Sequence, residues 1–100
     1  MSMIYLIATL TIKPGTRDLV IEAAKPCIAA TRQEPGCIRY DLNADVTNPE
    51  QLVFVEQWKS RKDIDLHFEQ PHMATWRSCL APHLVDRDIE LIYPDNIEKL

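Results

Sequence analysis

The sequence has no apolar run that approaches the ~20 residues of a membrane-spanning helix, so we expect no transmembrane segment. Cysteine is sparse as well: Cys27, Cys37 and Cys79 are odd in number and show no CxxC spacing. This pattern argues against a disulfide framework and a structural zinc site. Residues 1–5 lack a cationic stretch ahead of an apolar one, so we expect no signal peptide and a cytoplasmic protein.

Clustered positive charge and nucleotide-binding loops are also missing. The chain carries 11 basic and 15 acidic residues, a net charge of −4, and its Lys and Arg residues are scattered. A nucleic-acid-binding domain needs a basic patch, so we expect no nucleic-acid partner. No GxGxxG sequence or phosphate-binding loop occurs, so we expect neither a dinucleotide nor a flavin cofactor. A small molecule or another protein is the expected partner.

What the 100 residues do contain is the pattern of a single α+β domain, which we expect to span residues 1–100. β-Branched and aromatic residues predict strands at 3–12, 37–44, 51–58 and 84–93. Capping signals and helical spacing predict helices at 17–33, 61–69 and 71–80. The order β-α-β-β-α-α-β is that of a ferredoxin-like split βαβ fold, a four-stranded antiparallel sheet with helices on one face.

Pro26 lies inside the first helix and removes a backbone hydrogen bond, so we expect a kink or break near Glu22, or two shorter helices.

The strands at 3–12 and 51–58 carry apolar side chains on both faces, although helices cover only one. The uncovered face would exceed the apolar patch that soluble monomers tolerate. We therefore expect a homodimer whose sheets pack face to face over roughly 2,000 Å² or more.

The strongest candidate site is the segment from His67 to His72, with the sequence His-Phe-Glu-Gln-Pro-His. Helical spacing places His67 on the core-facing stripe with Ile64, and His72 falls in the first turn after Pro71. Two imidazoles facing a sheet would act as base and hydrogen-bond donor near neutral pH. The alternative is that one histidine is a satisfied core residue and the other a helix cap.

Aromatic side chains would line such a pocket, as they do in many small-molecule sites. The candidates are Tyr5, Tyr40, Trp58 and Trp76, each of which could equally be a core residue. Glu56 lies in an otherwise apolar strand. Turned inward, its carboxylate would need a partner such as Arg39, Arg77 or Arg87, and otherwise it would lie at a dimer edge.

A metal site has little support in the sequence. His67 and His72 are five residues apart, whereas the two histidines of HExxH are four apart, and no third ligand is placed. We therefore predict neither a metal nor any other cofactor.

Four short motifs flank the predicted strands and helices. They are Lys13-Pro14-Gly15, Glu34-Pro35-Gly36-Cys37-Ile38-Arg39-Tyr40, Glu56-Gln57-Trp58-Lys59-Ser60 and His67-x-x-x-Pro71-His72. Together they resemble, over nearly the whole chain, the antibiotic biosynthesis monooxygenase family. The resemblance implies a dimeric α+β barrel with a pocket between sheet and helices. It also implies oxygenation without metal or flavin, in which a deprotonated phenol or hydroquinone itself reduces dioxygen.

The His-x-x-x-Pro-His run is similar to that of the quinol monooxygenases and of the enzymes that process phosphorylated autoinducer-2. The resemblance implies roles for His67, His72 and Tyr40. The haem-degrading branch matches poorly, because its asparagine, its helix tryptophan and its haem-ligating histidine align with Ala8, His67 and Arg77.

The sequence favours a cofactor-independent monooxygenase that acts on a small aromatic or quinol-type substrate. Two alternatives stay open. The same base would serve a cofactor-free isomerase or lyase of the autoinducer-2-processing type. The fold could also carry a non-catalytic module that binds a small ligand.

Overall fold

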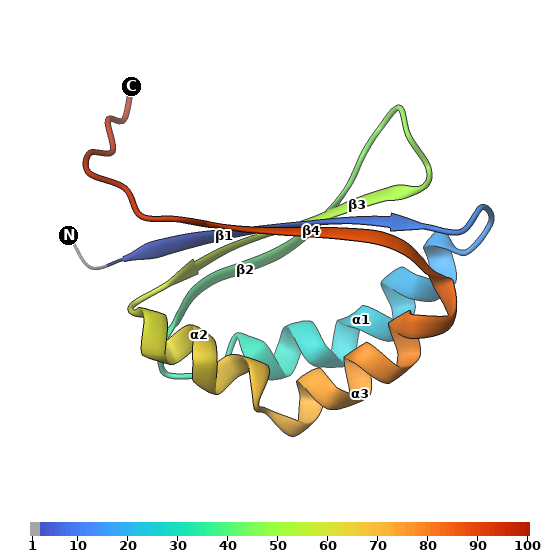
Figure 1. Ribbon diagram of the computed structural model, residues 1–100, viewed down its shortest axis with the longest axis horizontal. Helices are drawn as coiled ribbons and strands as arrows, with labels where there is room; N and C mark the ends of the chain where they lie inside the picture. The colour runs from blue at the N-terminus through green and yellow to red at the C-terminus, as the bar shows by residue number, and fades with distance from the viewer. Residues whose placement is uncertain (1–2) are drawn as a thin grey trace.

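Four strands and three α-helices follow one another in the predicted order. A computed structural model describes residues 3–100 (Figure 1). The elements are β1 (Ile4–Ile12), α1 (Arg17–Thr31), β2 (Cys37–Ala44), β3 (Gln51–Trp58), α2 (Arg61–Phe68), α3 (Pro71–Leu80), a 3₁₀ turn (Ala81–His83) and β4 (Leu84–Ile92). No helix within residues 3–100 is long and apolar enough to cross a membrane. The expectation of no signal peptide depends partly on Met1 and Ser2, which lie outside the described residues.

The four strands form one antiparallel sheet in the order β2-β3-β1-β4. All three helices lie on the same side of it (Figure 1). Every second residue of β1 and β3 is buried beneath the helices, as the alternating patterns predict. These residues are Ile4, Leu6, Ala8, Leu10, Ile12, Leu52, Phe54, Glu56 and Trp58. The predicted ferredoxin-like α+β fold, with helices on one face, is confirmed.

The other face of the sheet has a central apolar stripe. Ile7 lies opposite Val55, and their neighbour Val53 continues the stripe, each only partly buried. On the edge strand β4, Asp86, Asp88 and Glu90 pair with successive outward residues of β1 and so form an acidic row beside the stripe. On the opposite edge strand, β2, Arg39 and Asp41 pair with outward residues of β3 and form an ion pair. The uncovered face is therefore apolar at its centre and charged along both edges.

Pro26 does not divide the first helix. α1 runs without interruption from Arg17 to Thr31, so the expected break and the alternative of two shorter helices are wrong, whereas the alternative of a kink stays a prediction. Both Pro26 and Glu22 are exposed, so water can reach the Glu22 carbonyl that Pro26 leaves without a helical N–H partner. The helix also ends two residues before the predicted position of Gln33. The chain then turns, and the turn contains the next acidic residue, Glu34.

Candidate functional site

The loop after α1 carries Glu34 and is fixed at several points. The Glu34 backbone N–H donates to the carbonyl of Thr31 at 3.0 Å, and the Lys59 N–H donates to the carbonyl of Gly36 at 2.9 Å. Gly36 lies so close to the Asp63 side chain that an added methyl group would collide with it. The loop is therefore held against the start of α2, on the side where α2 presents a histidine.

Ser60 and Asp63 form a capping box that starts α2, in line with the capping signals that predict this helix. The Asp63 backbone N–H donates to Ser60 Oγ at 3.2 Å, and the Ser60 hydroxyl donates to Asp63 Oδ2 at 2.8 Å. One and two turns later, Ile64 and His67 face the core. His67 is 1% exposed, as its place on the inner stripe predicts.

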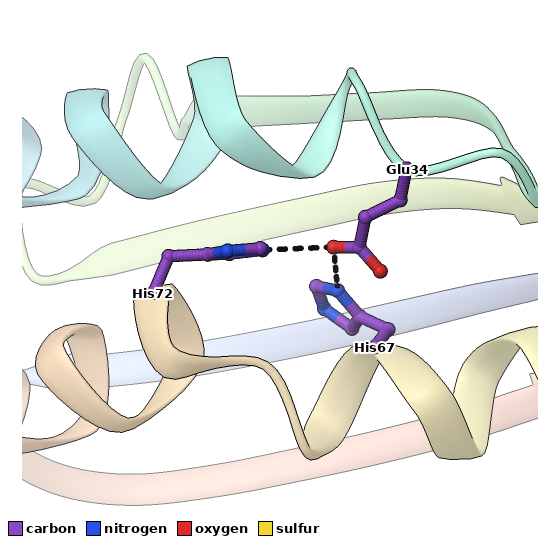
Figure 2. Close-up of side chains that lie close together, drawn as sticks. All are labelled: Glu34, His67 and His72. Atoms are coloured by element: carbon purple, nitrogen blue, oxygen red, sulfur yellow. Dashed lines mark hydrogen bonds and ion pairs between the residues drawn. The ribbon is translucent and has the colours of Figure 1, made fainter.

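Glu34, His67 and His72 form one hydrogen-bonded cluster (Figure 2). His67 Nδ1 and His72 Nε2 each lie 2.8 Å from the same atom, Glu34 Oε2. His72 comes from the first turn of α3, which begins at Pro71 as predicted. A carboxylate oxygen can only accept, so each of these nitrogens donates its hydrogen to Glu34. Whenever such a ring is neutral, its other nitrogen carries no hydrogen and can accept a proton.

Burial lowers the pKa of His67, because the protein interior disfavours the charged imidazolium. The hydrogen bond to Glu34 opposes this effect but does not reverse it. His67 therefore stays a neutral imidazole at neutral pH. Nε2 of His67 has no hydrogen-bond partner within residues 3–100, and the His67 side chain lines an open space.

That space is a cavity of about 60 Å³ between the sheet and the helices. Its sheet wall includes Tyr40 and Glu56, and its helix wall includes His67 and Trp76. The remaining wall is mostly apolar, with Leu6, Ala8, Leu10, Phe54, Met73 and Leu80 among its residues. The exposed lining residues are Arg77, Arg87 and Ile89, so the cavity opens at the edge formed by α3 and β4.

The four aromatic candidates are placed differently. Tyr40 and Trp76 line the cavity. Trp58 is fully buried behind it, with its ring 4.6 Å from that of His67 between centroids. Tyr5 lies on the uncovered face of the sheet, away from the cavity. Burial raises the pKa of Tyr40 far above its usual range, so its hydroxyl keeps its proton and cannot serve as a base.

Glu56 is buried with an uncharged partner rather than an arginine. Glu56 is 4% exposed, and its Oε1 accepts a hydrogen bond from Trp58 Nε1 at 2.9 Å. None of the ion pairs among residues 3–100 includes it, so the predicted arginine partner is wrong. The alternative position at a dimer edge is wrong too, because Glu56 faces the helices. Burial raises the pKa of Glu56 to about 7, and the hydrogen bond from Trp58 only partly offsets this.

Sequence reasoning missed Glu34 as a site residue. A signal for it was present, since an acidic residue directly before Pro35-Gly36 follows a predicted helix end. Glu34 is also the third potential metal ligand that the sequence did not place, and the three donor atoms lie within 4.8 Å of one another. Both nitrogens approach one oxygen at a hydrogen-bond distance, so a cation with bonds of about 2.0–2.2 Å would have to displace both hydrogen bonds. The expected lack of a metal stays a prediction.

Comparisons with known proteins agree on one family. The sequence model of the antibiotic biosynthesis monooxygenase family matches residues 3–78. The protein named "Uncharacterized protein sll1783", from Synechocystis, is 32% identical over 69% of this chain, but the match spans only 47% of that protein. "Probable quinol monooxygenase YgiN" of Escherichia coli is 26% identical over 92% of this chain and 98% of its own. The structure of Rv0793 from Mycobacterium tuberculosis matches with a TM-score of 0.88 and 26% identity, covering 98% of this chain and 100% of that one.

Proposed function

Since the chain belongs to the antibiotic biosynthesis monooxygenase family, we propose that it is a cofactor-independent monooxygenase for a small phenol or quinol. The observation that carries the proposal is the state of His67. Its Nδ1 is anchored to Glu34 at 2.8 Å, and its bare Nε2 is directed to a largely apolar cavity. An imidazole held by a carboxylate on one side, with its other nitrogen free, is the arrangement of a general base.

The cavity is small, so we propose a substrate with a single ring. Its volume of about 60 Å³ is below the ~150 Å³ of an engineered cavity that binds benzene. A ring can enter only if side chains at the mouth move outward: Arg87 is exposed, and Arg77 would have to release its 3.2 Å hydrogen bond to the Phe68 carbonyl. Met73 on the opposite wall adds adaptability, because methionine has three rotatable bonds.

The reaction that we propose starts with proton transfer. His67 Nε2 takes the proton of a phenolic hydroxyl, and Glu34 stabilises the imidazolium that results. The electron-rich phenolate then reduces dioxygen and binds it at carbon, and loss of water completes the oxygenation. One quinol and one dioxygen thus give one hydroxyquinone and one water. The protein supplies the base, the orientation and a space that excludes bulk water.

His72 has a different part in this proposal. It does not line the cavity but faces a wider surface pocket of about 500 Å³, together with Glu34 and Gln70. Its hydrogen bond holds the carboxylate of Glu34 toward His67. We therefore propose that His72 is a positioning residue. Tyr40 and Trp76 would contact the ring, with Trp58 behind them.

The functional unit that we propose is a homodimer, joined through the uncovered sheet face as in a dimeric α+β barrel. The stripe of Ile7, Val53 and Val55 supports it, because the helices leave this stripe without a cover. Sedimentation should give twice the chain mass, and Val55→Arg, at the centre of the stripe, should shift it to a monomer. A monomeric parent protein would contradict this part. The expected cytoplasmic location stays a prediction.

Oxygen uptake with a panel of single-ring hydroquinones tests the activity. We expect uptake accompanied by the hydroxyquinone product, with equal rates before and after removal of trace metal. Turnover of a carbonyl substrate that persists without oxygen would instead favour the isomerase or lyase alternative. Saturable binding without any turnover would favour the non-catalytic module.

A further inference from the structure

Glu56 is an ionisable group in the cavity that the proposed base does not use. It projects from β3 into the sheet wall, whereas His67 projects from α2 into the helix wall. Trp58 Nε1 holds one carboxyl oxygen, Oε1, at 2.9 Å. Oε2 has no partner in residues 3–100, and no fully buried oxygen there lacks one. Because Glu56 lines the cavity, Oε2 is the carboxyl oxygen available to a ligand there.

Ionisable groups from the neighbouring elements surround this carboxyl, including the thiols of Cys27 on α1 and Cys37 on β2, whose pKa values burial raises. Tyr40 lies directly opposite on β2, and His67 faces the cavity from α2. Arg77 on α3 and Arg87 on β4 are at the exposed mouth, and neither forms an ion pair with Glu56. The charge of Glu34 acts from beyond His67 and further disfavours a negative charge on Glu56. The group therefore has one neutral hydrogen-bond donor and no compensating cation.

We propose that Glu56 is the proton donor of the oxygenation: in its neutral form, it protonates the oxygen that leaves as water. The inference rests on the proposed function. It assigns separate proton transfers to the two walls of the cavity, base chemistry to His67 and acid chemistry to Glu56. Enzymes commonly run both kinds of chemistry at one pH by giving two groups different surroundings.

The steps balance without any further reactant. The phenolate carbon binds dioxygen to form a C–O bond, and the peroxide takes the proton that His67 received from the phenol. His67 then removes the hydrogen on the oxygenated carbon, and the electron pair of that C–H bond forms the carbonyl. The O–O bond breaks, and the departing hydroxide takes the Glu56 proton to become water. Return of a proton from His67 to Glu56 restores both groups.

Burial supports this role, because it raises the pKa of Glu56 to about 7. A large fraction of the carboxyl is therefore neutral at neutral pH, whereas an exposed glutamate would be ionised. A purely structural Glu56 would need only its acceptor oxygen for Trp58. Glu56→Gln separates the two roles, since the amide keeps the shape and an oxygen acceptor but cannot give up a proton in this pH range.

The test compares Glu56→Gln with the parent protein and with Glu22→Gln, a matched change at an exposed carboxylate of α1. With a single-ring hydroquinone, we expect kcat of Glu56→Gln to fall about 100-fold. The stalled peroxide should break down to quinone and hydrogen peroxide, so hydrogen peroxide should replace the hydroxyquinone. We expect the parent to lose activity above about pH 7, where the Glu56 carboxyl ionises, and Glu56→Gln not to show this loss. Unchanged kcat, products and pH profile would overturn the proposal.

A parent protein that takes up no oxygen would end the proposed function, and a binding measurement then tests Glu56 separately. Acetophenone is a single-ring ketone that does not titrate. Glu56 can donate to its carbonyl oxygen only while the Glu56 carboxyl is neutral. We expect the parent to lose affinity about tenfold between pH 6 and 8.5, while Glu56→Gln, which always carries an N–H donor, should not change. Equal pH dependence in the two proteins would refute donation by Glu56.

Discussion

Glu34 Oε2 accepts a hydrogen bond from one imidazole on each side, and the two sides differ in their access to water. On one side, His67 is 1% exposed and borders a cavity of about 60 Å³. On the other side, the His72 side chain is 21% exposed and borders a surface pocket of about 500 Å³. The two hydrogen bonds have the same length, 2.8 Å. Contact with the carboxylate therefore does not distinguish the histidines, but their surroundings do.

The difference shows how one carboxylate can support two unequal roles. In the proposed reaction, a proton taken from a substrate in the cavity goes to His67, because His72 does not line the cavity. The hydrogen bond from His72 keeps Glu34 in place while leaving that histidine open to solvent. The same dryness that lowers the pKa of His67 also raises that of Glu56 on the opposite wall. Burial thus separates an acid and a base across a small space.

The largest expected effect comes from a matched pair of substitutions. His67→Asn places its amide nitrogen near the former Nδ1, so it can keep the hydrogen bond to Glu34 while losing Nε2. His72→Gln keeps a donor near the former Nε2 in the same way. We expect oxygen uptake to fall about 10²–10⁴-fold in His67→Asn, because the base is lost, and to change less than about threefold in His72→Gln.

Thermal melts serve as the control, since both variants must stay folded for the comparison to hold. Equal losses in two folded variants would mean that the two histidines act in the same way, contrary to the placement of the cavity on only one side of Glu34.

The second effect concerns the free energy of unfolding and tests how well water is excluded from Glu56 on the cavity side. The ordinary pKa of Glu56 is 4.5, and burial raises it to about 7 in the folded protein. The folded state therefore binds this proton more tightly, so the stability associated with Glu56 is fully present below pH 4.5 and is lost as the pH rises through about 7. At about 1.4 kcal/mol per pKa unit, the loss is about 3 kcal/mol. Glu56→Gln should not show it.

Guanidinium unfolding of the parent and of Glu56→Gln at pH 4.5 and pH 8 measures this difference. Groups that do not interact with Glu56 titrate equally in both proteins, so their contributions cancel in the comparison. A difference between the two proteins that stays constant with pH would mean that water reaches Glu56, and the contrast between the two sides of Glu34 would be weaker than proposed.

Much of this arrangement follows from patterns that act locally along the chain. The alternation in β1 and β3, the capping box at Ser60 and the stripe containing Ile64 and His67 depend on spacing, which a sequence records directly. The fold and the inward direction of His67 could therefore be predicted. Pro26 was the exception in α1, because the cost of its missing hydrogen bond depends on whether water reaches the Glu22 carbonyl, which spacing alone does not determine.

The partners in the site could not be predicted in the same way. Glu34 meets His67 over 33 positions of sequence, through a loop that depends on the close approach of Gly36 to Asp63. Glu56 was expected to pair with an arginine, but its neighbour two positions along the same strand face, Trp58, supplies the donor. Such pairings depend on packing in three dimensions, and a pattern along the chain gives no distance between elements.

A smaller effect is expected when the hydrogen bond on the solvent side is removed. His72→Ala takes away the donor that holds Glu34 toward His67, whereas His72→Gln keeps it. We expect kcat of the alanine variant to fall about tenfold, which corresponds to the loss of one hydrogen bond of ordinary strength. Steady-state oxygen uptake by both variants measures it. A loss as large as that of His67→Asn would show that His72 itself takes part in proton transfer.

Removal of metal is expected to have no effect on oxygen uptake. This experiment tests whether His67 and His72 have different roles. A cation bound by Glu34, His67 and His72 would make both imidazoles ligands and would occupy the atoms that now form the two hydrogen bonds. His67 would then be held by a metal rather than by a carboxylate. Dialysis against EDTA should leave oxygen uptake unchanged, because the proposed reaction uses only the proton transfers of the chain. Loss of uptake on dialysis, with recovery on adding Fe²⁺ or Zn²⁺, would identify the cluster as a metal centre. The distinction between a base on the cavity side and a positioning residue on the solvent side would then not apply.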